Sequence, residues 1–292
     1  MANKIAIVTG SNKGIGFEIV KELCKRGVGV VYLTARDIQR GQKAVQELNR
    51  EGYFPKFHQL EVNNKQSVKT FADYLKKNYG EIDILINNAG VINEDFYKTS
   101  YEDSKYIIDI NYNGILLTEE YIYPIIKDNG RIINISSDCG HISNLKNRYW
   151  IERLTKDNLQ RDDINDFLNW FLQSVKNNTI DYNDFVEDKI LSYRISKIAV
   201  CALTRIQQKE IGKNISINSL HPGFVKTNMT KGCGNFTLDE AADTPVYLAL
   251  DIDQSVKGKY FWFDKTEQDW TDPNLKLYCV FDTIENQLQG PK

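Results

Sequence analysis

Short apolar runs alternate with amphipathic segments along almost the whole chain, and this alternation constrains the fold more than any other feature. The amphipathic segments carry apolar residues three or four positions apart, as helices do. Apolar strands joined by helices form a parallel sheet that is covered on both faces. We therefore expect an α/β fold with a doubly wound parallel sheet of about seven strands. The expected strands are 4–9, 30–34, 56–60, 82–86, 131–135, 215–220 and 259–263.

Two segments depart from this alternation. The first is an insertion at about 138–192, and its centre has the i, i+3, i+4, i+7 spacing of an amphipathic helix. Its apolar positions are Ile164, Phe167, Leu168, Phe171, Leu172 and Val175. We interpret it as a helix packed on the domain surface rather than a partner-binding helix. The second is a polar tail. With no linker or repeat, we expect one domain at 1–270 and a C-terminal extension at 271–292.

Composition excludes several classes of function. The 292 residues are 41% hydrophobic, and the net charge is −2 with acidic and basic residues interleaved. This balance argues against a nucleic-acid or membrane-surface partner. The five cysteines are scattered, which favours reduced thiols over a disulfide framework or a metal site. We see no secretory signal and no apolar run long enough to span a bilayer, so we expect a cytoplasmic protein.

A glycine-rich loop follows the first expected strand. The motif Thr9-Gly10-x-x-x-Gly14-x-Gly16 lies between that strand and the next helix. Residues without a Cβ let the backbone approach a pyrophosphate, which then lies at the positive end of the helix dipole. The position of this loop predicts a Rossmann-type nucleotide site.

The end of the second strand indicates which nucleotide binds. A free ribose 2′-hydroxyl is usually held by a carboxylate there, but this chain has Ala35 followed by Arg36. Lys13 in the glycine loop can reach the same place. Two cations without a carboxylate suit a 2′-phosphate, so we predict NADPH rather than NADH. Asp37 is expected to begin the next helix, and the alternative is that both cations are merely solvated.

Tyr193 and Lys197 are four residues apart in a helical context, so they project from the same face. An ammonium beside a phenol favours the phenolate, which lowers the phenol pKa from about 10 toward physiological pH. Such a tyrosine is a usable proton donor and acceptor. On this motif alone, two solvated residues on a helix are the more usual interpretation.

Further polar residues fall where the expected strands end. Asn87-Asn88-Ala89-Gly90 follows the fourth strand, Ser136-Ser137 the fifth, and Pro222-Gly223 the sixth. Asn111 lies in the long helix between the fourth and fifth strands, where an amide is neutral to unfavourable. Ligands of doubly wound sheets bind at these carboxyl ends of the strands.

In this order the motifs resemble the short-chain dehydrogenase/reductase family over about residues 4–265. More narrowly, the chain resembles the monomeric NADPH-dependent carbonyl reductases. The segments that carry this second resemblance are 34–37, 40–42, 57–60, the long insertion, 244–250 and 267–270. In that subgroup the insertion covers the helix face that other members use for oligomerisation, which implies a monomer.

The resemblance implies roles for matching residues. Tyr193 would protonate the carbonyl oxygen as hydride arrives, and Lys197 would lower its pKa and hold the ribose. Ser137 would steady the substrate oxygen, and Asn111 would bind a water that links Lys197 to solvent. The implied cofactor-binding residues are Gly10, Asn12, Lys13, Gly14, Ile15, Gly16, Arg36, Glu61, Val62, Asn88, Tyr193, Lys197, Pro222, Gly223, Val225 and Thr227. The implied substrate-contacting residues are Ser137, Asp138, Cys139, Tyr193 and Phe224.

The chain departs from the carbonyl reductase pattern mainly on the substrate side. Asp138 and Cys139 stand where apolar residues are usual, His221 replaces a cysteine, and Phe224 replaces a tryptophan. Beside the expected adenine, Glu61 replaces an aspartate. We expect His221 to be a hydrogen-bonded loop residue rather than a second acid. We also expect an aromatic substrate wall from Phe224, Trp150 and Tyr149.

The leading hypothesis is an NADPH-dependent reductase of ketones, aldehydes or quinones with a broad substrate range. One alternative is a reductase specific for a single endogenous ketone, such as a steroid, a prostaglandin or a terpenoid. The other is an NADPH-binding redox sensor without turnover, since fold alone does not guarantee activity. The presence of every expected catalytic residue argues against the sensor.

Overall fold

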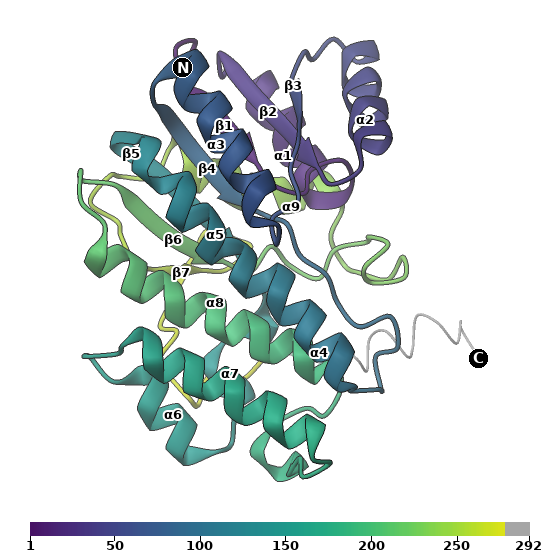
Figure 1. The fold of residues 1–292 in the computed structure, drawn as a ribbon, viewed down its shortest axis with the longest axis vertical. Coiled ribbons are helices and arrows are strands. Elements are labelled where there is room, and N and C mark those ends of the chain that lie inside the picture. The colour runs from purple at the N-terminus through teal and green to yellow at the C-terminus, as the bar shows by residue number, and fades with distance from the viewer. Residues whose placement is uncertain (278–292) are drawn as a thin grey trace.

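One mixed sheet of eight strands organises the part of the chain that the computed structural model describes, residues 1–277 (Figure 1). The strand order is β3-β2-β1-β4-β5-β6-β7-β8, and neighbouring strands are parallel from β3 to β7. The strands are β1 (Ile5–Val8), β2 (Val30–Ala35), β3 (Lys56–Gln59), β4 (Ile82–Asn87), β5 (Ile126–Ile135), β6 (Ser216–Leu220), β7 (Tyr260–Phe261) and β8 (Glu267–Gln268). The expected doubly wound α/β fold is confirmed.

The eighth strand was not expected. β8 pairs antiparallel with β7 at the edge of the sheet. It comprises two residues, Glu267 and Gln268, which are polar and carry no apolar alternation. Such an edge strand faces solvent and needs no hydrophobic signal.

Helices cover both faces of the sheet (Figure 1). They are α1 (Gly14–Lys25), α2 (Ile38–Arg50), α3 (Lys65–Tyr79), α4 (Tyr101–Ile108), α5 (Gly114–Tyr121), α6 (Arg148–Thr155), α7 (Arg161–Lys176), α8 (Leu191–Glu210) and α9 (Leu238–Leu250). Side chains of α1, α2 and α9 share one buried core cluster, whereas those of α7 and α8 belong to another. The sheet is therefore buried between two helical layers, which explains its nearly continuous apolar strands.

The strand order reverses between β1 and β4. From β1 the chain winds outward through β2 and β3, and then returns to build β4 to β7 on the other side. Loops that leave the carboxyl ends of β1 and β4 therefore diverge and leave a crevice between them. The glycine loop lies at this switch point.

The insertion between β5 and α8 contains α6, α7 and several short 3₁₀ turns. As predicted from its spacing, α7 buries Ile164, Phe167, Leu168, Phe171 and Val175, while Leu172 is only partly buried. These residues share one core cluster with apolar residues of α8. The insertion is thus an additional layer on the outer side of α8.

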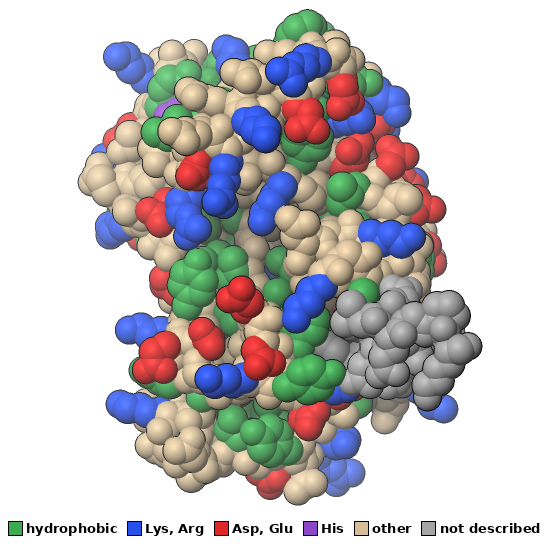
Figure 2. All heavy atoms as spheres, turned by 90° about the vertical axis from the view of Figure 1, so that its right-hand side faces the viewer, with side chains coloured by type: hydrophobic (Ala, Val, Ile, Leu, Met, Phe, Trp, Pro, Cys, Tyr) green, Lys and Arg blue, Asp and Glu red, His purple; other side chains and the backbone are tan. Residues whose placement is uncertain are grey.

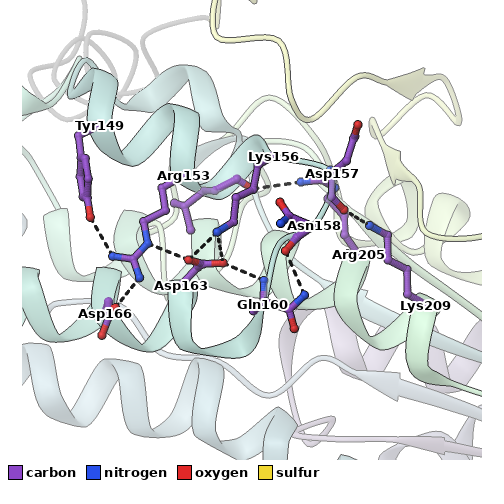
Figure 3. Close-up of polar contacts among 11 residues, drawn as sticks. Tyr149, Arg153, Lys156, Asp157, Asn158, Gln160, Asp163, Asp166, Arg205 and Lys209 are labelled. Carbon is purple, nitrogen blue, oxygen red and sulfur yellow. Dashed lines mark hydrogen bonds and ion pairs between the residues drawn. The ribbon is translucent and has the colours of Figure 1, made fainter.

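Ion pairs join the two helices of the insertion (Figure 3). The buried Asp163 carboxylate accepts from Arg153 Nε and Lys156 Nζ, each at 2.8 Å, and from the Gln160 backbone N–H at 2.9 Å. Arg153 also pairs with Asp166. Asp163 therefore connects α6, the turn that follows it and the first turn of α7.

The part of the chain that the structure describes has neither a membrane-spanning helix nor a metal-binding cluster. Within residues 1–277, no helix combines the length and apolar character that crossing a bilayer requires. The same residues contain no group of three or more His, Cys, Asp or Glu side chains placed to hold a metal ion. Of the expected extension, 271–277 form no helix or strand, and 278–292 lie outside the described residues.

Candidate active site

The glycine loop forms a cradle between β1 and α1. Gly10 and Gly14 have φ values of +60° and +62°, a region that favours glycine. A Cβ on Gly10 would lie 2.8 Å from Ala89 Cα, and one on Gly16 would lie 2.3 Å from Asn88 Nδ2. No side chain caps the first turn of α1. Its N–H groups therefore remain available to an anionic ligand, and the cradle fits a pyrophosphate.

Asn88 braces this loop from the end of β4. Its side-chain Nδ2 donates to the carbonyls of Thr9 at 2.8 Å and Gly10 at 3.1 Å. In return, Thr9 Oγ1 accepts from the backbone N–H groups of Asn88 and Ala89, both at 3.0 Å. The Asn88 amide therefore holds the glycine loop, and its expected contact with the nucleotide stays a prediction.

The tip of β2 has the predicted charge pattern. Ala35 ends the strand, and Asp37 caps α2 by accepting from the Arg40 N–H at 2.8 Å. Its carboxylate is thus engaged at the helix start. Arg36 is exposed, and its Nη1 donates to the Tyr106 hydroxyl at 3.3 Å. Lys13 is exposed at the N-cap of α1. On the face of the molecule that Figure 2 shows, several Lys and Arg side chains gather beside a hollow.

Asn111 lies in a π-helical turn, Asp109–Asn113, which separates α4 from α5. The single long helix expected here is therefore interrupted. The turn aims the amide at the β4 loop, where Asn111 exchanges hydrogen bonds with the Val91 N–H at 2.8 Å and carbonyl at 2.9 Å. Its Nδ2 also donates to Ser196 Oγ at 2.9 Å. Asn111 thus connects the β4 loop with α8.

Asn111 and Lys197 converge on one point near Gly90. A Cβ built on Gly90 would lie 3.4 Å from Asn111 Oδ1 and 3.6 Å from Lys197 Nζ. Lys197 Nζ also donates to the Ile135 carbonyl at 2.7 Å. The ammonium is therefore held from α8 between the ends of β4 and β5.

Tyr193 and Lys197 are both buried on α8, and Lys197 Nζ lies 5.6 Å from the centre of the tyrosine ring. Burial lowers the pKa of Lys197 to about 8. Burial also raises the pKa of Tyr193 well above its ordinary value, although a hydrogen bond with Ser137 opposes this effect. The expected lowering of the tyrosine pKa is therefore wrong for this structure, because desolvation of the phenol outweighs the favourable neighbours.

Ser137 follows β5 and begins a short 3₁₀ turn, Asp138–Gly140. Its hydroxyl donates to Asp138 Oδ1 at 2.7 Å and accepts from the Cys139 N–H at 3.3 Å. Three contacts from later in the chain hold this region. The Tyr260 hydroxyl donates to the Ser137 carbonyl at 2.9 Å, and Trp270 Nε1 donates to the Gly140 carbonyl at 2.7 Å. His141 Nε2 donates to the Asp269 carbonyl at 3.0 Å.

A pocket lies next to Ser137 and the turn that follows it. All five residues that were expected to contact substrate line this pocket: Ser137, Asp138, Cys139, Tyr193 and Phe224. It is also lined by Ile15, Pro222, Gly223, Val225 and Thr227, which were expected to bind the cofactor. Sequence reasoning missed its apolar wall of Ile92, Phe96, Ile190 and Met229. These residues come from loops without periodicity, so no sequence signal marks them.

The expected aromatic wall is only partly right. Phe224 lines the pocket, but Trp150 is buried in the insertion core, at 5.4 Å from the Phe167 ring. Tyr149 is exposed on α6. Both belong to the insertion, where aromatic residues pack α6 against α7 rather than reach the site.

Comparisons with known proteins agree with this geometry. Residues 4–148 match the short chain dehydrogenase family. The chain is 37% identical to carbonyl reductase [NADPH] 3 of Rattus norvegicus over 85% of this chain and 91% of the relative. It is 33% identical to carbonyl reductase [NADPH] 1 of Homo sapiens over 91% of this chain and 98% of that protein.

Among solved structures, salutaridine reductase from Papaver somniferum superposes with a TM-score of 0.82 at 33% identity, over 89% of this chain and 99% of that one. Menthone neomenthol reductase from Mentha piperita gives 0.76 at 27% identity, over 89% and 98% of the two chains. Sequence identity above 30% across most of both chains, together with the shared fold, shows that this chain belongs to the short-chain dehydrogenase/reductase family.

Proposed function

We propose that this protein is an NADPH-dependent carbonyl reductase that converts ketones, aldehydes or quinones to alcohols or hydroquinones. The observation that carries the proposal is the pocket that joins Ser137 and Tyr193 to the loops expected to hold the nucleotide. The names of the carbonyl reductase relatives support both the cofactor and the reaction.

The nucleotide would lie across the switch point of the sheet. The glycine cradle and the uncapped start of α1 suit its pyrophosphate. Lys13 and Arg36 suit a 2′-phosphate, because both are exposed and Ala35 supplies no carboxylate to repel it. When bound, NADPH supplies the hydride that reduces the carbonyl carbon.

Tyr193 would donate its phenolic proton to the carbonyl oxygen. A phenol whose pKa lies above its ordinary value is protonated at neutral pH and is therefore ready to donate. Lys197, with a pKa of about 8, carries a positive charge at that pH. This charge stabilises the phenolate that forms as the proton leaves, so its effect is larger in the transition state than in the ground state. Ser137 would orient the substrate oxygen beside Tyr193.

The experiment measures the loss of NADPH or NADH absorbance with a panel of quinones, an α-dicarbonyl and simple ketones. We expect turnover of several carbonyl compounds, with NADPH preferred. Tyr193→Phe should lower kcat/KM by about 100-fold or more, because general acid catalysis typically contributes this much. Tyr182→Phe is the matched control, since Tyr182 is exposed in the insertion and should leave turnover unchanged.

A Tyr193→Phe enzyme that keeps most of its turnover would refute the acid role. Tight NADPH binding without turnover of any carbonyl compound would instead refute the reductase. Equal rates with NADH and NADPH would refute the assignment of Lys13 and Arg36.

A further inference from the structure

The wall of the substrate pocket is largely apolar, but a carboxylate and an imidazole lie together at one corner. Ile92, Phe96, Ile190, Phe224 and Met229 provide the apolar surface. The polar corner, which we call the acidic corner, consists of Asp138 and His221 beside the catalytic Ser137. Asp138 belongs to the turn after β5, and His221 follows β6 directly. Because these strands are neighbours, their ends bring the two side chains together.

Asp138 takes the only proton that Ser137 can donate. The Ser137 hydroxyl donates to Asp138 Oδ1 at 2.7 Å, and the Cys139 N–H donates to the same oxygen at 2.8 Å. The contact with His221 Nδ1, at 3.7 Å, also involves Oδ1. Among the described residues, Oδ2 therefore has no hydrogen-bond partner. The Asp138 side chain keeps 14% of its surface accessible, so the carboxylate can still meet a ligand.

The carboxylate is ionised. Burial alone raises its pKa, but His221, the Ser137 hydroxyl, Arg194 and the Cys139 N–H more than offset this and hold the pKa below its ordinary value. A buried carboxylate next to a substrate site is costly unless donors satisfy it. The acidic corner therefore favours a ligand that brings another hydrogen-bond donor.

The surroundings of His221 are a second indication that this corner binds a ligand. It is buried and lies against the Trp262 ring, with centroids 4.7 Å apart, yet its Nδ1 has no hydrogen-bond partner among the described residues. Burial lowers the pKa of this imidazole, and the neighbouring Asp138 carboxylate opposes this shift. With a proton on Nδ1, His221 is a donor beside a carboxylate that accepts. A single ligand group that both donates and accepts a hydrogen bond can therefore pair with Asp138 and His221 together.

We propose that the acidic corner binds a hydroxyl group on the carbon next to the reacting carbonyl, so that α-hydroxy ketones and aldehydes are the preferred substrates. This proposal rests on the proposed reductase function. The two oxygens of an α-hydroxy carbonyl lie about one hydrogen-bond length apart, and the Ser137 and Asp138 oxygens are separated by 2.7 Å. The carbonyl can thus face Ser137 and Tyr193 while the neighbouring hydroxyl meets Asp138.

Binding of this hydroxyl also releases Ser137. The substrate hydroxyl donates to Oδ2 of Asp138, the oxygen without a partner among the described residues. The carboxylate then has another donor, so the Ser137 proton on Oδ1 is free to turn toward the carbonyl oxygen. A ketone without a donor leaves the Ser137 proton on Asp138 and receives a hydrogen bond from Tyr193 alone. An ammonium in place of the hydroxyl has no lone pair to accept from His221, which is why we assign a hydroxyl.

The test compares three aryl ketones that differ only next to the carbonyl: 2-hydroxyacetophenone, 2-methoxyacetophenone and acetophenone, each with NADPH. A quinone without a hydroxyl serves as the reporter of general reductase activity. We expect kcat/KM for the hydroxy ketone to exceed that for its methyl ether by about tenfold or more. A site built to pair with a hydroxyl discriminates strongly against an analogue that lacks the donor.

Asp138→Ala should bring the ratio of hydroxy to methoxy ketone close to one. Asp138→Asn keeps the shape of the side chain and guards against a folding defect, and it should lower the ratio because the charged acceptor is lost. Asp73→Ala is the matched control. Asp73 is exposed on α3, where it pairs with Lys69, and its loss should leave the ratio as in the wild type.

Each outcome decides the proposal. Reduction of the quinone with equal kcat/KM for the hydroxy and methoxy ketones in the wild type would overturn the acidic corner and leave the reductase standing. A ratio that survives both Asp138 substitutions would also overturn it. Reduction of neither quinone nor ketone would refute the proposed function, and the acidic corner with it.

Discussion

Tyr193 and Lys197 lie on the buried side of α8, where desolvation sets their protonation more than their mutual distance does. Burial favours the neutral forms of both, so the phenol keeps its proton and the ammonium loses its proton more readily. In the direction of carbonyl reduction both effects are useful near neutral pH. The phenol is an acid with its proton in place, and the lysine is still cationic.

The lysine predicts a pH dependence of the reaction. The pKa of Lys197 falls from 10.5 to about 8, so the ammonium is lost as the pH rises through this value. We expect kcat/KM for carbonyl reduction to fall above about pH 8, because the phenolate then forms without a neighbouring positive charge. The measurement is a pH profile of kcat/KM at saturating NADPH. Lys197→Arg, which stays charged, should be slower but should lack this fall. A wild-type profile that stays flat beyond about pH 9 would contradict the prediction.

Some site residues were predictable because they impose a requirement on the backbone or follow a strand. Gly10 and Gly14 adopt positive φ, and Ser137 lies just after β5, so the residue types at these positions could be matched to their places in the fold. The polar partners of Asn111 were not predictable, because a π-helical turn leaves no pattern that distinguishes it from an α-helix. Trp150 was assigned to the pocket wrongly, since composition does not say which core an aromatic residue joins.

At the scale of elements, the insertion shows what periodicity does and does not reveal. The apolar face of α7 followed from its spacing, whereas the ion pairs that fix α6 against α7 did not. Charged residues are usually solvated, so a sequence does not distinguish Asp163, which is buried, from its exposed neighbour Asp166. The two aspartates differ in burial only because α6 and α7 pack against each other in the folded protein.

This difference predicts unequal effects on stability. Asp163→Asn removes the charge that Arg153 and Lys156 share, and we expect it to lower the free energy of unfolding by about 2–3 kcal/mol. Asp166→Asn should cost less than about 1 kcal/mol, because its side chain is 54% exposed. Urea denaturation followed by circular dichroism measures both. Equal losses for the two variants would show that the buried carboxylate has no special role.

At the scale of the whole molecule, the alternation of strands and helices predicted the doubly wound form of the sheet, because right-handed crossovers leave few arrangements. The apolar pocket wall and the edge strand β8 could not be predicted from the sequence, and the reason is the same for both. They are built from short irregular segments whose positions are determined only by the elements that surround them.

The insertion also bears on assembly. α7 packs on the outer side of α8 and shares its core cluster, so this face of α8 is already covered within the chain. We therefore predict a monomer. Light scattering after size-exclusion chromatography should give a mass near the 33.7 kDa of one chain at micromolar concentration. A mass of twice this value would contradict the prediction and would require an interface elsewhere on the surface.

The contacts that Tyr260 and Trp270 make with the turn after Ser137 have a consequence for biosynthesis. A ribosome delivers the chain from its N-terminus, so the glycine loop, Tyr193 and Lys197 are synthesised before Tyr260 and Trp270. Because a domain generally folds as a unit, the turn after Ser137 gains these two contacts only when almost the whole domain has been made. We expect a chain cut before Tyr260 to lack a fixed serine even if it still collapses around the nucleotide loop.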